Sequence, residues 1–113
     1  MILHILPRDS WPAAEITAAS LESEGFMHCS DPGTVHLPAN RIFAGRTDLV
    51  LLEIDPALLG VPVRWEPGVP AIENGPWFPH VYGPIPAEAV VAVHDFVPGP
   101  TGNFELPESL AKR

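Results

Sequence analysis

Three histidines of this chain stand in short apolar or extended segments, where packing alone does not require a polar ring. His4 lies within residues 2–6, His28 lies within residues 26–30, and His80 opens a later extended segment. An imidazole with an ordinary pKa near ~6.5 exchanges a proton at neutral pH, so histidine serves as an acid or a base. Each ring taken singly has a plainer interpretation, a partly buried histidine bonded to a backbone carbonyl. Three such rings favour a shared cleft, with His4 and His80 as candidate catalytic residues.

Neighbouring side chains extend this candidate site. Side chains alternate along a strand, so His28 shares its face with Phe26 and Ser30. Four aromatic residues surround the segment of His80 and predict an aromatic wall, namely Trp65, Trp77, Phe78 and Tyr82. An apolar cleft with a few polar groups suits a planar ligand such as a nucleobase. We therefore expect His28, Ser30, Trp77 and Tyr82 to bind a ligand.

A zinc site is the first alternative for this cluster of residues. His28 and Cys29 are adjacent and point to opposite faces of a strand, and the chain has no Cys-x-x-Cys or His-x-x-x-His spacing. We predict no metal site. Cys29 as a nucleophile is a weaker hypothesis, because its place in a strand indicates a small buried residue. His36 and His94 are expected on the surface.

The carboxylates offer a second alternative, glycoside hydrolysis. That reaction needs two carboxyl groups at a fixed separation across one cleft. Glu53, Glu66 and Glu73 are available, and nothing in the sequence selects a pair. Glu66 ends the predicted strand that begins at residue 61.

The elements that must position these residues are short and separated by prolines, of which the chain has 15. Helices are predicted from Ser10 to Ile16 and from Asp31 to Phe43, with Pro38 kinking or splitting the second. Strands are predicted over residues 2–6, 26–30, 49–54, 61–66 and 90–96, with a Gly/Pro-rich loop over 67–79. The sum is an α+β fold, a small, twisted, mostly antiparallel sheet with one or two short helices packed on it. Residues 98–113 are a polar Pro/Gly-rich tail that we expect to be loosely held.

Composition narrows the class of protein. With 113 residues the chain has room for one domain and one core. A net charge of −8 with only six Lys and Arg argues against long nucleic acid as a partner, although a few nucleotides in a pocket are compatible with it. No apolar run approaches the roughly 18 residues of a membrane span. A single cysteine and the lack of a signal-peptide pattern favour the cytoplasm.

Several stretches together form a known pattern, namely GFMHCS (25–30), FAG (43–45), DLVLLEID (48–55), WE (65–66) and FPHVYGPIP (78–86). Over residues 1–97, taken as a single α+β domain, the chain resembles the bacterial family called domain of unknown function 952. That family is similar to a compact ADP-ribosyltransferase superfold, with tRNA 2′-phosphotransferases among its relatives. The resemblance implies a split sheet and NAD as the cofactor or substrate.

The resemblance also implies roles for individual residues. In the superfold a first strand carries a His that contacts the ribose beside nicotinamide, and a later strand ends in a Ser near it. His4 and Ser30 match these two positions in order and context. The catalytic Glu of the superfold has His80 or Glu66 as its possible counterparts. The usual His-Gly-Thr triplet is absent, because Ile5 and Leu6 follow His4.

Two functional hypotheses remain from the sequence. In the first, the chain is an enzyme that binds NAD, ADP-ribose or another nucleotide and acts at the ribose, by ADP-ribosyl or phosphoryl transfer. In the second, it is a non-catalytic module that binds a small ligand or a protein, having kept the cleft and lost the chemistry. One fold hosts many functions, so the side chains of the site must decide between them.

Overall fold

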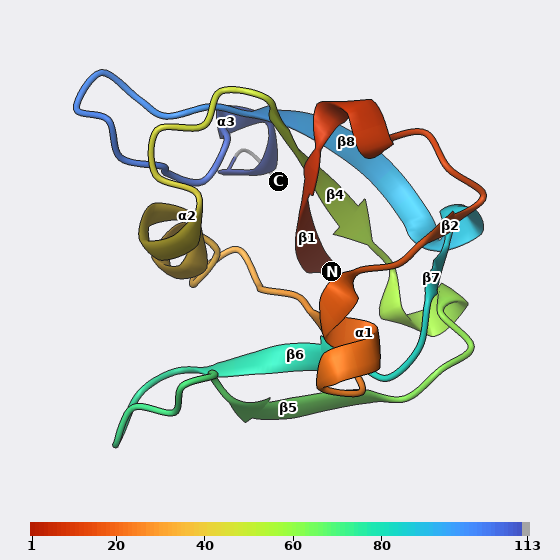
Figure 1. The fold of residues 1–113 in the computed structure, drawn as a ribbon. Coiled ribbons are helices and arrows are strands. Elements are labelled where there is room, and N and C mark those ends of the chain that lie inside the picture. Colours follow the sequence, from red (N-terminus) through yellow and green to blue (C-terminus); the bar gives the residue numbers. More distant parts are fainter. Residues whose placement is uncertain (112–113) are drawn as a thin grey trace.

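The computed structural model describes residues 1–111 (Figure 1). Its strands form two three-stranded antiparallel sheets and one two-stranded ribbon. The first sheet has the order β1 (Ile2–Pro7), β4 (Leu49–Ile54), β8 (Val90–Phe96); the second has the order β3 (Met27–His28), β6 (Trp77–Val81), β5 (Val63–Pro67). The ribbon joins β2 (Glu15–Ile16) to β7 (Ile85–Pro86). The predicted α+β class with mostly antiparallel strands is confirmed.

The helices are short and lie beside the sheets. The α-helices are α1 (Ala19–Ser23), α2 (His36–Ile42) and α3 (Glu108–Ala111), and the 3-10 helices are η1 (Arg8–Ser10), η2 (Pro56–Leu58) and η3 (Ala87–Ala89). In Figure 1, β1 and β4 cross above β5 and β6, and α2 flanks the space at one end. Among residues 1–111, no helix is long and apolar enough to cross a bilayer.

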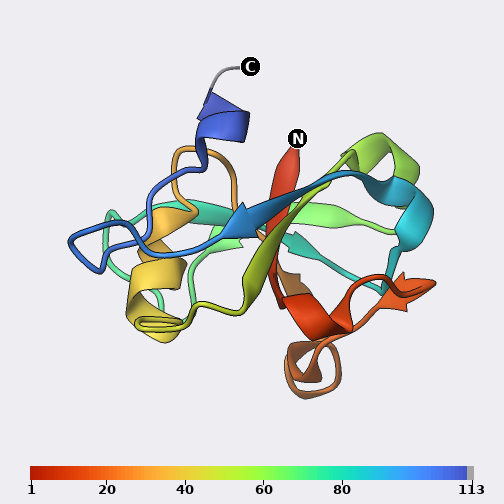
Figure 2. The same cartoon turned by 90° about the horizontal axis from the view of Figure 1, so that it is seen from above.

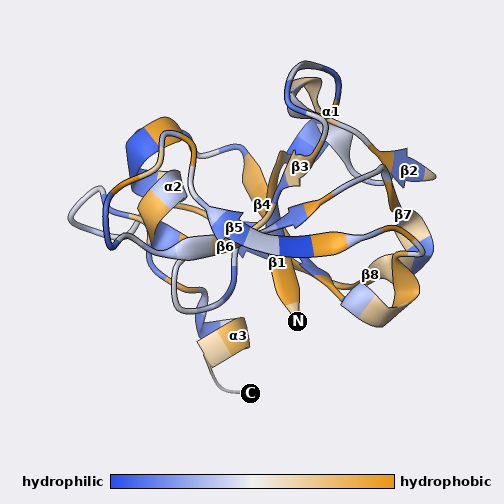
Figure 3. Cartoon of the chain, turned by 90° about the horizontal axis from the view of Figure 1, so that it is seen from below, coloured by the Kyte–Doolittle hydropathy of each residue, from blue (hydrophilic) through white to orange (hydrophobic). Residues whose placement is uncertain are grey.

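Strand β4 is the centre of the fold, because it pairs with β1 on one side and β8 on the other. All six of its residues are buried, and most of its length is hydrophobic (Figure 3). Side chains alternate between two hydrophobic clusters, with Leu52 and Ile54 in one and Leu49 and Leu51 in the other. Glu53 lies on the same face as Leu49 and Leu51, so a carboxylate is buried in this strand.

The first predicted helix is wrong. Residues 8–10 form a 3-10 turn, Glu15 and Ile16 form β2, and the helix that follows begins only at Ala19. Trp11 has φ −119° and ψ 138°, an extended backbone. The residue before a proline is driven out of the helical region, so Pro12 prevents a helix from passing through Trp11.

The second predicted helix begins later than expected. Residues 31–35 form a turn in which the amides of Thr34 and Val35 both donate to the Asp31 carbonyl, and α2 follows from His36. Pro38 does not split this helix. It lies in the first turn, where an amide has no intrahelical acceptor to lose, so the missing N–H of proline costs little there.

The expectation of a loosely held tail is also wrong. Phe104 and Leu110 are buried in the cluster that contains Leu49 and Leu51, and the Phe104 ring lies 4.8 Å from that of Phe96. Asn40 of α2 binds the tail backbone twice, since Asn40 Oδ1 accepts from the Phe104 amide at 2.6 Å and Asn40 Nδ2 donates to the Phe104 carbonyl at 3.2 Å. Residues 98–111 therefore complete the core of the domain, and residues 112 and 113 of the predicted tail lie outside the described part of the chain.

Candidate functional site

A cavity of about 970 Å³ lies between the two sheets and α2. Its inner wall carries four of the predicted site residues, namely His4, His28, Ser30 and His80. Its outer wall is mostly apolar and comes from α2 and from the loop between β5 and β6, with Leu37, Ile42, Val69, Ile72 and Phe78 among the lining residues. Arg41 is the only Lys or Arg that lines the cavity within the described chain.

Backbone pairing explains why distant histidines meet here. Leu3 and Ser30 exchange two backbone hydrogen bonds, of 2.8 and 2.7 Å, and this isolated bridge ties β1 to the end of the β3 segment. His28 is in turn the direct partner of His80 in the β3–β6 ladder. These two pairings bring three segments from different parts of the sequence to one wall.

His80 on β6 is held by Glu66 on β5, and Glu66 is held in turn by Tyr82, the residue after β6. The Nδ1 of His80 lies 2.9 Å from Glu66 Oε1, and the Tyr82 hydroxyl donates to the same oxygen at 2.5 Å. The hydrogen bond from Tyr82 and then that from His80 hold the pKa of Glu66 below its usual range. Glu66 is therefore a carboxylate at neutral pH, and it raises the pKa of the Tyr82 hydroxyl. Because a carboxylate only accepts, Nδ1 of His80 must carry the proton.

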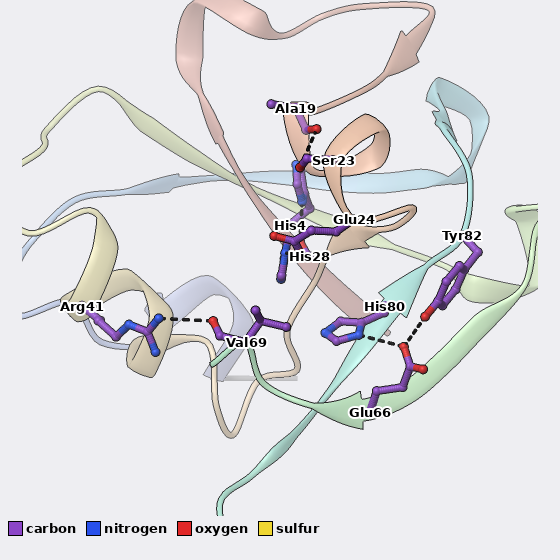
Figure 4. Close-up of polar contacts among 10 residues, drawn as sticks. All are labelled: His4, Ala19, Ser23, Glu24, His28, Arg41, Glu66, Val69, His80 and Tyr82. Atoms are coloured by element: carbon purple, nitrogen blue, oxygen red, sulfur yellow. Dashed lines mark hydrogen bonds and ion pairs between the residues drawn. The ribbon is translucent and has the colours of Figure 1, made fainter. Parts of the chain in front are cut away.

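The remaining nitrogen of His80 is the unusual atom of the site. The ring is 2% exposed and stacks on Phe26, with centroids 4.0 Å apart and planes 15° from parallel. In the neutral imidazole, with Nδ1–H bound to Glu66, Nε2 keeps a lone pair. Nε2 is buried and has no hydrogen-bond partner within residues 1–111. Figure 4 shows it on the side of the ring turned away from Glu66, toward His28 and Val69.

A second histidine–carboxylate pair stands opposite. His28 Nε2 lies 2.7 Å from Glu24 Oε2, and both side chains are partly exposed. The ring centroids of His28 and His80 are 5.4 Å apart, with the ring edge of one toward the face of the other. The cavity thus has two imidazoles on one wall, each bonded to its own glutamate (Figure 4).

His4 is the third histidine of the cavity, and it is also buried. Its Nδ1 donates to the His28 carbonyl at 2.8 Å, which leaves Nε2 as an acceptor. Burial lowers the pKa of His4, and the bond to the carbonyl opposes this only in part. His4 is therefore neutral at pH 7. Burial also raises the pKa of the neighbouring Cys29 to about 12, so Cys29 is an unreactive thiol, in accord with its expected role as a small buried residue.

The match to known proteins is clear at the level of family. The model of the family described as "Protein of unknown function (DUF952)" matches residues 5–93. The chain belongs to the DUF952 family. No curated protein matches it significantly. The cavity residues from His28 to His80 all lie within the matched range, and His4 lies one residue before it.

Solved structures similar to this DUF952 chain come from one bacterium. The crystal structure of protein CC0527 from Caulobacter crescentus has a TM-score of 0.80 and 30% sequence identity, over 97% of both chains. The solution NMR structure of CC0527 has a TM-score of 0.77 and 29% identity, over 99% of this chain and 97% of that one. The fold described above, including most of the segment after residue 97, is thus shared with an experimentally determined structure.

Three predicted residues of the DUF952 chain do not line the cavity. Glu66 and Tyr82 lie behind His80 and reach the cavity only through that ring. Trp77 is 56% exposed and points away, because it alternates with Phe78, which lines the cavity in its place. The expected aromatic wall therefore comes from Phe78 at the cavity and Phe26 behind His80.

Sequence reasoning missed two residues of this site, namely Glu24 and Arg41. Phe78 was predicted as part of the aromatic wall, and the alternation of side chains placed Phe26 on the face of His28. Glu24 is four residues before His28, but the intervening chain is a helix end followed by a strand, so no helical spacing could indicate the pair. Within residues 1–111, no group of three or more His, Cys, Asp or Glu side chains is placed to hold a metal ion.

Proposed function

We propose that the cavity binds NAD, ADP-ribose or a related nucleotide, and that His80 acts as the acid–base group at its ribose. The observation that carries the proposal is the buried Nε2 of His80, which has a lone pair and no partner. A buried polar atom without a hydrogen bond costs about 1–3 kcal/mol, and such atoms are rare in folded proteins. A ligand hydroxyl that donates to Nε2 removes this cost.

The cavity wall supports a nucleotide-sized ligand. Ligand pockets usually enclose about 300–1,000 Å³ and are mostly apolar with a few convergent polar groups, and this cavity falls in that range. The Phe78 ring and the apolar side chains of α2 offer a surface for a base. Arg41, whose Nη2 donates to the Val69 carbonyl at 3.2 Å, stands among these apolar residues and supplies a cation for phosphate oxygens.

The inner wall supports chemistry at a hydroxyl. Glu66 fixes the tautomer of His80, so Nε2 can take a proton from a ribose hydroxyl, a role for which a positioned base contributes typically 10²–10⁴-fold. His4 accepts from a second hydroxyl through Nε2, and Ser30 orients the nicotinamide side. Since Glu66 does not reach the cavity, its role is to position His80.

One observation favours the alternative, a non-catalytic module that binds the ligand without turning it over. Glu24 is the only carboxylate that lines the cavity in the described chain, and it is paired with His28. The oxocarbenium-type charge of an ADP-ribosyl transfer is usually stabilised by a carboxylate near the reacting carbon. A chain that lacks one there would bind the nucleotide and leave it intact.

Calorimetric titration and thermal shift with NAD, ADP-ribose and ADP test the proposal. A ligand at 100 times its dissociation constant adds about 2.7 kcal/mol to stability. His80→Gln should weaken binding at least tenfold, about 1.4 kcal/mol, whereas His36→Gln, outside the cavity lining, should not. Binding without release of nicotinamide from NAD would favour the non-catalytic module. No binding, or binding indifferent to His80→Gln, would contradict the proposal.

A further inference from the structure

A second chain of hydrogen bonds lies outside the cavity, at the first sheet. Ser109 Oγ of α3 is 2.6 Å from His94 Nδ1 on β8, and His94 Nε2 is 3.0 Å from Glu53 Oε1 on β4. In Figures 1 and 2, α3 lies beside β8. The expectation of a surface role for His94 is wrong, because that residue is only 8% exposed.

With Glu53 ionised and His94 neutral, the direction of these hydrogen bonds follows from the chemistry of the groups. A carboxylate at Glu53 can only accept, so Nε2 of His94 carries the proton. Nδ1 of His94 then has a lone pair, and the Ser109 hydroxyl must donate to it. A hydroxyl that donates to an imidazole, whose other nitrogen donates to a carboxylate, has the order of groups found in an activated serine nucleophile, with Nδ1 and Nε2 exchanged relative to the Ser-His-Asp triad.

The exposure of these three residues increases from Glu53 through His94 to Ser109. Glu53 is 2% exposed, His94 is shielded, and Ser109 is exposed. Replacing a buried ionisable pair by apolar residues is often neutral or stabilising. A contribution to stability therefore does not by itself explain the buried pair of Glu53 and His94. The geometry makes the pair a candidate for function, because its far end contacts an exposed hydroxyl beside a hollow. The hydroxyl end is the end that a substrate can reach.

The hollow beside Ser109 limits what that substrate can be. It encloses about 470 Å³, is open to solvent, and is lined by both His94 and Ser109. Val93, Val97 and Pro107 supply apolar surface, and three carboxylates also line it, from Asp95, Glu105 and Glu108. Because like charges repel, these carboxylates disfavour an anionic substrate. The hollow shares no lining residue with the histidine-lined cavity.

We propose that Ser109 is a nucleophile toward small neutral or cationic carboxylic esters, with His94 as its base and Glu53 orienting the imidazole. Ser109 Oγ forms a bond to the acyl carbon while its proton passes to His94 Nδ1. The ester C–O bond then breaks, and the leaving alcohol takes that proton. Water, deprotonated by His94, attacks the acyl-serine, releases the carboxylic acid and restores the Ser109 hydroxyl. Ser109 and His94 lie beyond residues 5–93, the range that the family model matches, whereas Glu53 lies within it.

A fluorophosphonate probe, which replaces fluoride by a serine oxygen, tests the proposal on the full chain. Intact mass and peptide mapping should show one adduct, on Ser109. Ser109→Ala should abolish it, His94→Gln should slow it at least tenfold, and Ser23→Ala should leave it unchanged, because the exposed Ser23 hydroxyl donates only to a helix carbonyl. The chain should release p-nitrophenol faster from p-nitrophenyl acetate than from the anionic glutarate half-ester. No adduct, or an adduct indifferent to His94→Gln, would overturn the proposal.

A second pair of variants keeps the test decisive if His94→Gln does not fold. Ser109→Cys places a thiol against the same imidazole nitrogen, and Ser23→Cys is the matched exposed thiol. Iodoacetamide at pH 7 should alkylate the Ser109→Cys chain at least tenfold faster, because His94 draws the proton from the thiol. Equal rates would show that the hydrogen bond only anchors α3, and would overturn the proposal as well.

Discussion

His80 and Glu66 are joined by an Nδ1–Oε1 distance of 2.9 Å between the adjacent strands β6 and β5. Glu66 pairs in register with Phe78, two residues before His80, so the carboxylate and the imidazole project from one face of the ladder. Tyr82 follows two residues later on that face and donates to the same oxygen. The strand period thus aligns three polar groups behind the wall of the cavity, and only the last nitrogen of His80 is left for a ligand.

The first prediction concerns the tautomer of His80. Above the titration range of histidine, at pH 8, wild-type His80 should carry its proton on Nδ1, because the Glu66 carboxylate accepts it. Glu66→Gln replaces the charged acceptor by an amide that can also donate, so the two tautomers should become mixed. Long-range ¹H–¹⁵N correlation spectra of the imidazole distinguish the states. Trp65→Phe, on the opposite face of β5, is the control. An unchanged His80 spectrum in Glu66→Gln would contradict the arrangement.

The second prediction concerns the central strand. Leu51 is fully buried, so Leu51→Ala removes methyl groups and leaves a cavity, which should cost roughly 2–5 kcal/mol of unfolding free energy. Val93, which is half exposed on the adjacent β8, is the matched control, and Val93→Ala should stay within about 0.5 kcal/mol. Urea unfolding monitored by tryptophan fluorescence measures both. Similar losses for the two variants would mean that β4 is not the centre of the core.

Strands β4 and β8 have the bounds that the sequence predicts, and the reason is local. Each is an apolar run of strand length closed by turn residues, such as Asp55 and Pro56 after β4. The sequence could also predict that His4, His28 and His80 line one cavity, because polar rings in apolar strands need polar neighbours. Their contacts could not be anticipated, since they depend on a bridge between Leu3 and Ser30 that no local pattern marks.

The errors have two physical origins. The expected helix before residue 16 failed at Trp11, where a proline effect outweighs the capping signal of Ser10. The tail and His94 were misjudged together. Composition makes residues 98–113 look solvated, yet two apolar residues, Phe104 and Leu110, fill the cluster beside β4 and β8. The same tertiary packing buries His94 and Glu53, and the polar composition of the tail does not reveal this packing.

The third prediction tests this packing. Phe104→Ala should destabilise the domain by roughly 3–5 kcal/mol, as truncation of a buried phenylalanine does. Val97→Ala, at a half-exposed position just before the tail, should change stability by less than about 0.5 kcal/mol. Thermal and urea unfolding give the comparison. A Phe104→Ala chain as stable as wild type would mean that the tail is loosely held in solution, as its composition suggests.

The last prediction is the pH dependence of stability that His4 produces. Burial lowers the pKa of His4 in the folded state below the 6.5 of an ordinary histidine, so the unfolded chain binds more protons at His4 than the folded chain does. Stability therefore rises with pH where the two states differ, is fully present above pH 6.5, and falls as the pH drops from 6.5 toward the folded-state pKa. His4→Gln retains a donor for the His28 carbonyl and removes the titration. The free energy of unfolding should fall less between pH 7.5 and 5.5 in His4→Gln than in wild type, as urea unfolding at each pH measures. Since the other four histidines are common to both chains, the difference between the two slopes isolates His4. Equal slopes would show that His4 is solvated or protonated in the folded protein, and would remove the neutral acceptor that we assign to the inner wall of the cavity.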